Sequence, residues 1–163
     1  MAEYNGNGRT NYFRVKDISA LKAELLEYGI ETATMAEARM GAEFVLHEAT
    51  GKDKPAGSIA LFSYGTWPQL DDESVAQRLE IDDEDTPVPN KHASLAQLVA
   101  SHLLEGEVAV FIEVGFEKMR YLGGHATAVD STGDLRSIDL DDIYGLAAAE
   151  LSTNGQPITM AHY

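Results

Sequence analysis

Residues 113–130, EVGFEKMRYLGGHATAVD, gather side chains that could carry out acid-base chemistry. Glu113 and Glu117 could act as a general acid and base beside His125. Arg120 could hold an anion. The apolar residues around Glu113 alternate as in a β-strand, with valines on the opposite face, and charged tips on such strands commonly meet solvent. We therefore interpret the cluster as structural, with a small enzyme that uses these four residues as an alternative.

Other motifs in the chain give no specific chemistry. The five histidines lack a short metal-binding spacing, and the acidic runs LDDES and EIDDEDT lack the alternating-oxygen loop of a calcium site. There is no GxSxG motif, no P-loop and no GxGxxG motif. Without cysteine, the chain has neither disulfides nor thiolate ligands. We expect no cofactor, no metal and no catalytic residue.

The charge of the chain predicts the class of its partner. The 163 residues include 27 acidic and 12 basic side chains, for a net charge of −15. Such a charge repels the nucleic-acid backbone, so we expect no direct nucleic-acid binding. It also steers a protein towards basic surfaces. No apolar run reaches the roughly 18 residues of a membrane span. We expect a cytoplasmic protein with a basic protein partner and no membrane contact.

Residues 66–91 form an acidic segment in which neither helical nor strand periodicity is sustained, and we predict a long surface excursion. Its clustered carboxylates could imitate the phosphates of DNA, which carry one charge per about 1.7 Å of helix axis. The alternative is that they only keep the protein soluble. The residues that we assign to partner binding are Asp71, Asp72, Glu73, Asp82, Asp83, Glu84 and Asp85.

The rest of the pattern predicts the α+β class: one domain over residues 10–163, with a largely antiparallel sheet and two or three helices packed on one face. Residues 1–9 are expected to be a flexible lead-in. The strongest strand pattern is 108–116, which should be central in the sheet. The other expected strands lie within 11–16, 31–37, 42–49, 58–64, 125–130, 134–139 and 158–163.

Three helices are predicted from capping residues followed by apolar side chains at helical spacing. The first begins after Asp17 and ends at Gly29. The second begins at Ser94, which opens a capping box with Gln97. The third begins at Asp139 and should pack through an apolar face. The residues of that face are Leu140, Ile143, Tyr144, Ala147 and Leu151.

Three stretches resemble a set of short acidic proteins encoded on bacterial plasmids, phages and integrated elements: TNYFRVKD at 10–17, EVGFEKMRYLGGHATAV at 113–129 and LDDIYGLA at 140–147. The resemblance carries over no catalytic residue. It implies a setting in which small acidic proteins inhibit host defence, as anti-restriction or anti-CRISPR proteins do. The leading hypothesis is thus a non-enzymatic inhibitor of a nucleic-acid-binding defence protein. The alternative is an immunity-type protein that neutralises a basic toxin.

Overall fold

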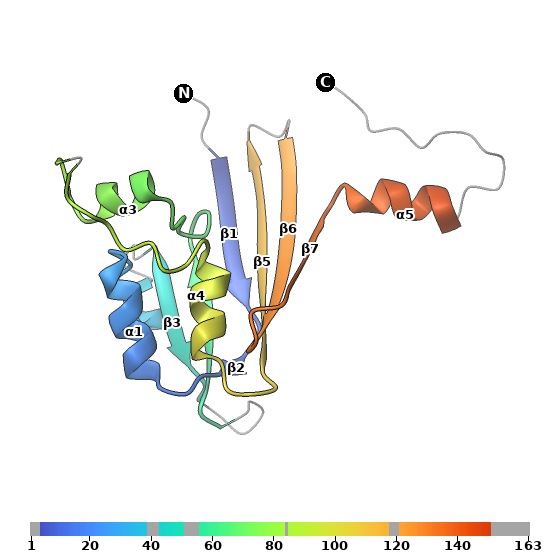
Figure 1. Ribbon diagram of the computed structural model, residues 1–163. Helices are drawn as coiled ribbons and strands as arrows, with labels where there is room; N and C mark the ends of the chain where they lie inside the picture. The colour runs from blue at the N-terminus through green and yellow to red at the C-terminus, as the bar shows by residue number, and fades with distance from the viewer. Residues whose placement is uncertain (1–3, 39–42, 51–55, 84, 118–120, 151–163) are drawn as a thin grey trace.

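A computed structural model describes residues 4–38, 43–50, 56–83, 85–117 and 121–150, and these form an α+β fold around one antiparallel sheet (Figure 1). The strands are β1 (Tyr4–Thr10), β2 (Phe13–Arg14), β3 (Phe44–Glu48), β4 (Ser58–Ser63), β5 (Val108–Glu117), β6 (Tyr121–Asp130) and β7 (Leu135–Asp139). The helices are α1 (Ile18–Glu27), α2 (Met35–Ala38), α3 (Asp72–Arg78), α4 (Leu95–His102) and α5 (Asp142–Glu150).

The strand order is β2-β4-β1-β5-β6-β7, with β3 on the other side of β4. Both β1 and β2 pair with β4, and the register changes by one residue between Gly8↔Ser63 and Phe13↔Ile59, so the chain bulges between them. At this bulge the Thr10 hydroxyl accepts a hydrogen bond from the Leu61 amide at 2.8 Å. β1 therefore lies in the interior of the sheet. The expectation of a flexible lead-in over residues 1–9 is wrong for 4–9, because this segment pairs with β5 along its whole length.

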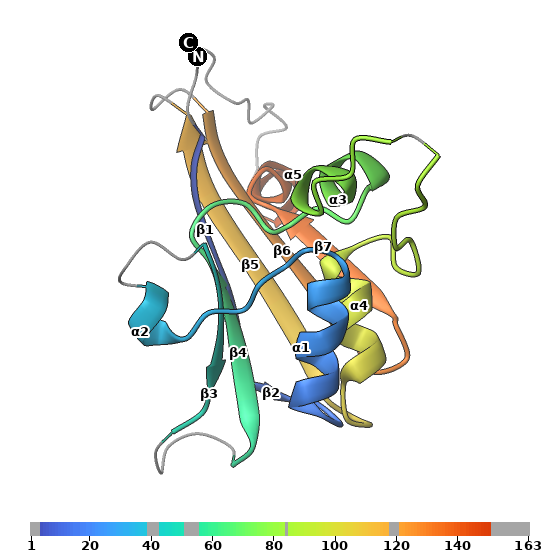
Figure 2. The same cartoon turned by 90° about the vertical axis from the view of Figure 1, so that its left-hand side faces the viewer.

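Helices α1 and α4 pack on one face of the sheet, which we call the inner face (Figures 1 and 2). Both caps are those predicted. The Asp17 carboxylate accepts from the amides of Ser19 and Ala20, and the Ser94 hydroxyl accepts from the Gln97 amide. Gly29 ends the first helix with a φ of 69°. Local capping chemistry thus sets the two helices that cover the inner face.

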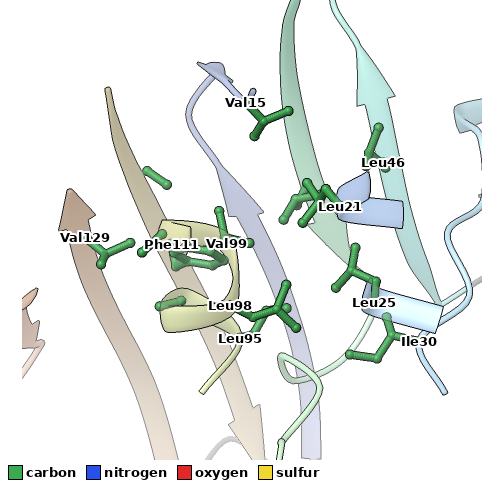
Figure 3. Close-up of a cluster of buried hydrophobic side chains, with 14 of the residues drawn as sticks. Val15, Leu21, Leu25, Ile30, Leu46, Leu95, Leu98, Val99, Phe111 and Val129 are labelled. Carbon is green, nitrogen blue, oxygen red and sulfur yellow. The ribbon is translucent and has the colours of Figure 1, made fainter. Parts of the chain in front are cut away.

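The core lies between these helices and the inner face, as Figure 3 shows for Leu21, Leu25, Leu98 and Phe111. β5 has neighbours on both sides, so its predicted central position is confirmed. The buried face of β5 is the opposite of the expected one. Ala109 and Phe111 are buried, whereas the valine face, which we call the outer face, is open, with Val114 52% exposed.

Three further expectations differ from the structure. Residues 35–38 form helix α2 and no strand, because Thr34 and Glu37 make a capping box: the Glu37 carboxylate accepts from the Thr34 amide at 2.6 Å. The acidic segment contains helix α3, capped by Asp71. Helix α5 has no buried residue and does not pack on the sheet. The strand expected within 158–163 lies outside the described residues.

Candidate functional site

The structure brings together only part of the predicted acid-base cluster of Glu113, Glu117, Arg120 and His125. Glu113 of β5 pairs in register with His125 of β6, and both side chains lie on the inner face. Glu117 is four residues further along the strand, about 13 Å by the rise of an extended chain. The Glu117 side chain and Arg120 lie outside the described part. The sheet therefore places two of the four residues side by side.

His125 joins a carboxylate to two hydroxyls across β6 and β7. Its Nδ1 lies 2.8 Å from Asp139 Oδ1, and its Nε2 lies 2.7 Å from Thr127 Oγ1. Thr127 Oγ1 in turn lies 2.9 Å from Ser137 Oγ. The order carboxylate, imidazole, hydroxyl is that of an activated nucleophile.

The surroundings of this chain of groups favour a structural role. Thr127 is buried, at 9% exposure, so its hydroxyl presents little surface to a substrate. The Glu113 carboxylate accepts the Trp67 amide at 2.9 Å. Trp67 itself stacks edge-on against Phe111, with ring centroids 5.3 Å apart. These bonds tie the 64–68 loop and strand β7 to the sheet, where buried polar groups need partners.

The acidic segment builds a second candidate site. Helix α3 and the loop that follows it enclose a hollow of about 410 Å³, which we call the acidic hollow. Four of its lining residues are acidic: Asp72, Glu73, Asp82 and Asp83. Two runs of acid that are nine residues apart in the sequence thus face one cavity.

The other residues assigned to partner binding have different places. Asp71 is the N-cap of α3, where its carboxylate accepts the Ser74 amide at 2.9 Å. The hydrogen bonds from Ser74 hold the pKa of Asp71 below its usual range. Asp85 donates its amide to Asp83 Oδ1 in the turn after the hollow. Glu84 lies outside the described residues.

A larger groove, of about 990 Å³, runs along the opposite side of α3. Glu31, Glu37 and Glu43 line it together with Arg78. The Arg78 guanidinium is committed to the fold, since it donates to the carbonyl oxygens of Tyr28 at 2.9 Å and Gln69 at 2.6 Å. Partial burial lowers its pKa. Carboxylates therefore line the hollows on both sides of α3.

The chain that follows the acidic segment is held to α1 by one glutamate and two histidines, which we call the Glu24 clamp. The sequence did not reveal this cluster. Glu24 of α1 lies between two imidazoles: His102 Nε2 at 2.6 Å and His92 Nε2 at 3.1 Å. Burial opposes ionisation of Glu24, yet the hydrogen bonds from His102 and then His92 hold its pKa below its ordinary value. Glu24, His92 and His102 do not lie at a spacing that would place them on one helix face. The sequence therefore contained no signal that they meet.

Within the part of the chain that the structure describes, no group of three or more histidine, aspartate and glutamate side chains is arranged to hold a metal ion. Among those same residues, no helix is both long and apolar enough to cross a bilayer. Comparison with protein-family models, with curated proteins and with solved structures found no match.

Proposed function

We propose that this protein is a non-enzymatic inhibitor that acts in the cytoplasm by binding a basic surface of a nucleic-acid-handling protein of a host defence system. The acidic hollow beside α3 is the observation that carries the proposal. Its carboxylates form the binding surface, together with Asp71 and Asp85 at its margins. The net charge of −15 supplies the long-range attraction to a basic partner.

The acidic residues of the hollow have no basic side chain paired with them in the described chain. The ion pairs of the described chain involve Glu24, Glu27, Glu48, Glu107, Asp134 and Asp139, and none uses a carboxylate of the acidic hollow. Asp72 and Glu73 lie in the first turn of α3, where the helix dipole favours acidic side chains. The Asp83 carboxylate accepts hydrogen bonds from the Asp85 amide and the Thr86 hydroxyl. These contacts position the acidic side chains without neutralising their charge, so a basic partner can still be attracted to them.

The shape of the site indicates how a partner would be bound. The acidic residues line one hollow, so the site suits a protruding lysine or arginine side chain of the partner. Arginine is well suited to this, because its planar fork donates to carboxylates in pairs. In this form of mimicry, the acids occupy the side chains that otherwise bind phosphates.

The concave shape also supports a second candidate, an immunity-type protein that neutralises one basic toxin. A hollow for protruding basic side chains also fits basic residues at the active site of such a toxin. The two candidates differ in the partner and share the acidic hollow as the binding surface.

The first experiment measures the charge dependence of the hollow with a deca-arginine peptide as the probe. The triple variant Asp72→Asn, Asp82→Asn, Asp83→Asn should weaken binding by about tenfold, because each exposed ion pair contributes about 0.5 kcal/mol and 1.4 kcal/mol corresponds to tenfold. The matched control is Glu105→Gln, Asp141→Asn, Glu150→Gln, which removes the same charge from exposed positions elsewhere.

Equal weakening by the two triple variants would mean that the peptide senses only the net charge, and the hollow would not be the site. The second experiment uses the defence protein or toxin that the chain inhibits. Binding should weaken steeply with salt and should compete with that partner's nucleic acid. Salt-insensitive binding that survives the triple variant would contradict the proposal.

A further inference from the structure

The outer face of the sheet carries an apolar strip on β5, β6 and β7. Cross-strand register places Ile112, Ala126 and Ile138 in one row, with the residues of neighbouring rows above and below. Ile138 is 64% exposed. We call this surface the outer strip. Its members are Val110, Ile112, Val114, Gly124, Ala126, Ala128 and Ile138.

The outer strip has a defined relief. The outward positions of β6 are small, namely Gly124, Ala126 and Ala128. Branched residues stand beside all three on β5, and Ile138 stands beside Ala126 on β7. The helices that cover the sheet, α1 and α4, lie on the inner face (Figure 2). A strip that is low in the middle and raised at its borders is a surface on which a helix can lie.

Helix α5 has the complementary property. Its apolar side chains Ile143 and Leu146 are 57% and 52% exposed, and none of its residues is buried. In Figure 1 it extends away from the sheet beyond β7. A helix of 9 residues is marginal in water without tertiary packing. The described chain gives α5 no such packing.

We propose that two copies of this chain form a two-fold dimer in which each α5 packs on the outer strip of the other copy. The helix carries Ile143 and Leu146 to the low centre of the strip. Its length is about 14 Å, and the rows from Gly124 to Ala128 span about 13 Å, with Leu140 of the same chain at the Gly124 end. Exchange of identical elements is a common route to dimers.

The direction in which α5 leaves the sheet favours another copy over its own. The Leu140 amide donates to the Gly124 carbonyl at 2.9 Å, which continues the β6–β7 pairing up to the helix. A Cβ built on Gly124 would lie 2.6 Å from Leu140 Cγ, so Leu140 occupies the end of the strip in its own chain. From this point α5 extends past the β7 edge, where a second copy would lie.

Charge complementarity supports the same occupant. Arg9 of β1 pairs with Ile112, and Arg136 of β7 pairs with Ala128, so a cation stands on each side of the strip. The helix carries acids at its two ends, Asp142 and Glu150. Arg136 holds only a highly exposed partner in its own chain, Asp134 at 3.3 Å. Each copy carries a net charge of −15, so two copies repel each other. At physiological salt this repulsion is largely screened between exposed charges more than about 8 Å apart.

The first test is the mass of the full chain in solution, measured by size-exclusion chromatography with light scattering. Wild type should show twice the 17.7 kDa of one chain. Ile143→Lys on the helix and Ile138→Lys on the strip should each give a monomer. Leu26→Lys is the matched control, because Leu26 of α1 is equally exposed, at 57%, and lies outside both surfaces.

The second test uses the absence of cysteine in the chain. A copy with Leu146→Cys is mixed with a copy with Ala126→Cys, and a disulfide should join the two different chains upon mild oxidation. A chain that carries both cysteines and forms the bond within a monomer would overturn the dimer and place α5 on its own strip. A wild-type monomer, or a dimer that both lysine variants leave intact, would overturn it equally.

This proposal is independent of the proposed function, because the acidic hollow lies beside α3 and neither dimer variant touches it. The monomeric Ile143→Lys chain should therefore bind the deca-arginine peptide as wild type does.

Discussion

The two faces of strand β5 differ in a way that their composition does not indicate. The face with Val108, Val110, Ile112, Val114 and Phe116 is the more apolar, yet it is the open one. The other face carries Ala109, Phe111 and Glu113, and it forms the core side. Burial thus follows the placement of α1 and α4 and does not follow the apolar content of a strand face. A contiguous apolar face that is exposed to solvent often marks an interaction site.

Truncation of one side chain on each face tests this difference most directly. Phe111→Ala should lower the free energy of unfolding by about 3 to 5 kcal/mol, because Phe111 is buried among the helices and leaves a cavity. Val108→Ala should change it by about 0.5 kcal/mol or less, because Val108 is 44% exposed and lies at the end of β5 beyond the outer strip. Chemical denaturation of both variants measures the difference. Comparable losses would mean that the outer face is a second core.

Addition of one methyl group at a glycine on each face tests the same difference on a smaller scale. A Cβ on Gly8 would lie 2.7 Å from the Trp67 ring, which is held against Phe111 on the inner face. Gly8→Ala should therefore cost about 1 to 3 kcal/mol through overpacking. On the outer face, Gly124→Ala meets the exposed Leu140 side chain, which can turn aside. In dilute protein its cost should stay within about 0.5 kcal/mol.

The inner layer is also held by the Glu24 clamp, and its removal should have a pH signature. The folded pKa of Glu24 lies below its ordinary value of 4.5, so its stabilising effect is complete above that value and is lost as the pH falls through the folded pKa. Glu24→Gln should cost about 1 to 2 kcal/mol near neutral pH, and the difference from wild type should vanish in acid.

Denaturation curves of Glu24→Gln and wild type over an acidic pH series measure this difference. Glu105→Gln serves as the control, because Glu105 is exposed and outside the clamp. A deficit in Glu24→Gln that persists unchanged below the folded pKa would show that shape, and not charge, holds the clamp.

Much of the fold was predictable because it depends on local rules. The caps at Asp17 and Ser94, the central position of β5 and the β6–β7 hairpin follow from residues close together in the sequence. One failure was also local in origin. The capping box of Thr34 and Glu37 decided a helix where β-favouring residues predicted a strand. For the candidate site, the acidic residues were named in advance, but their gathering in one hollow was not.

The strand alternation and the helix caps follow from residue types at short spacing, and the net charge of −15 follows from composition, so all three could be read from the sequence. It could not decide which face of β5 the helices cover, since both faces are apolar enough to be buried. It could not place Glu24 between His92 and His102, because these residues meet only when α1 packs beside α4. The tertiary structure alone decided these points, along with the open outer strip and the unpacked α5, because all of them depend on contacts between segments that are distant in the chain.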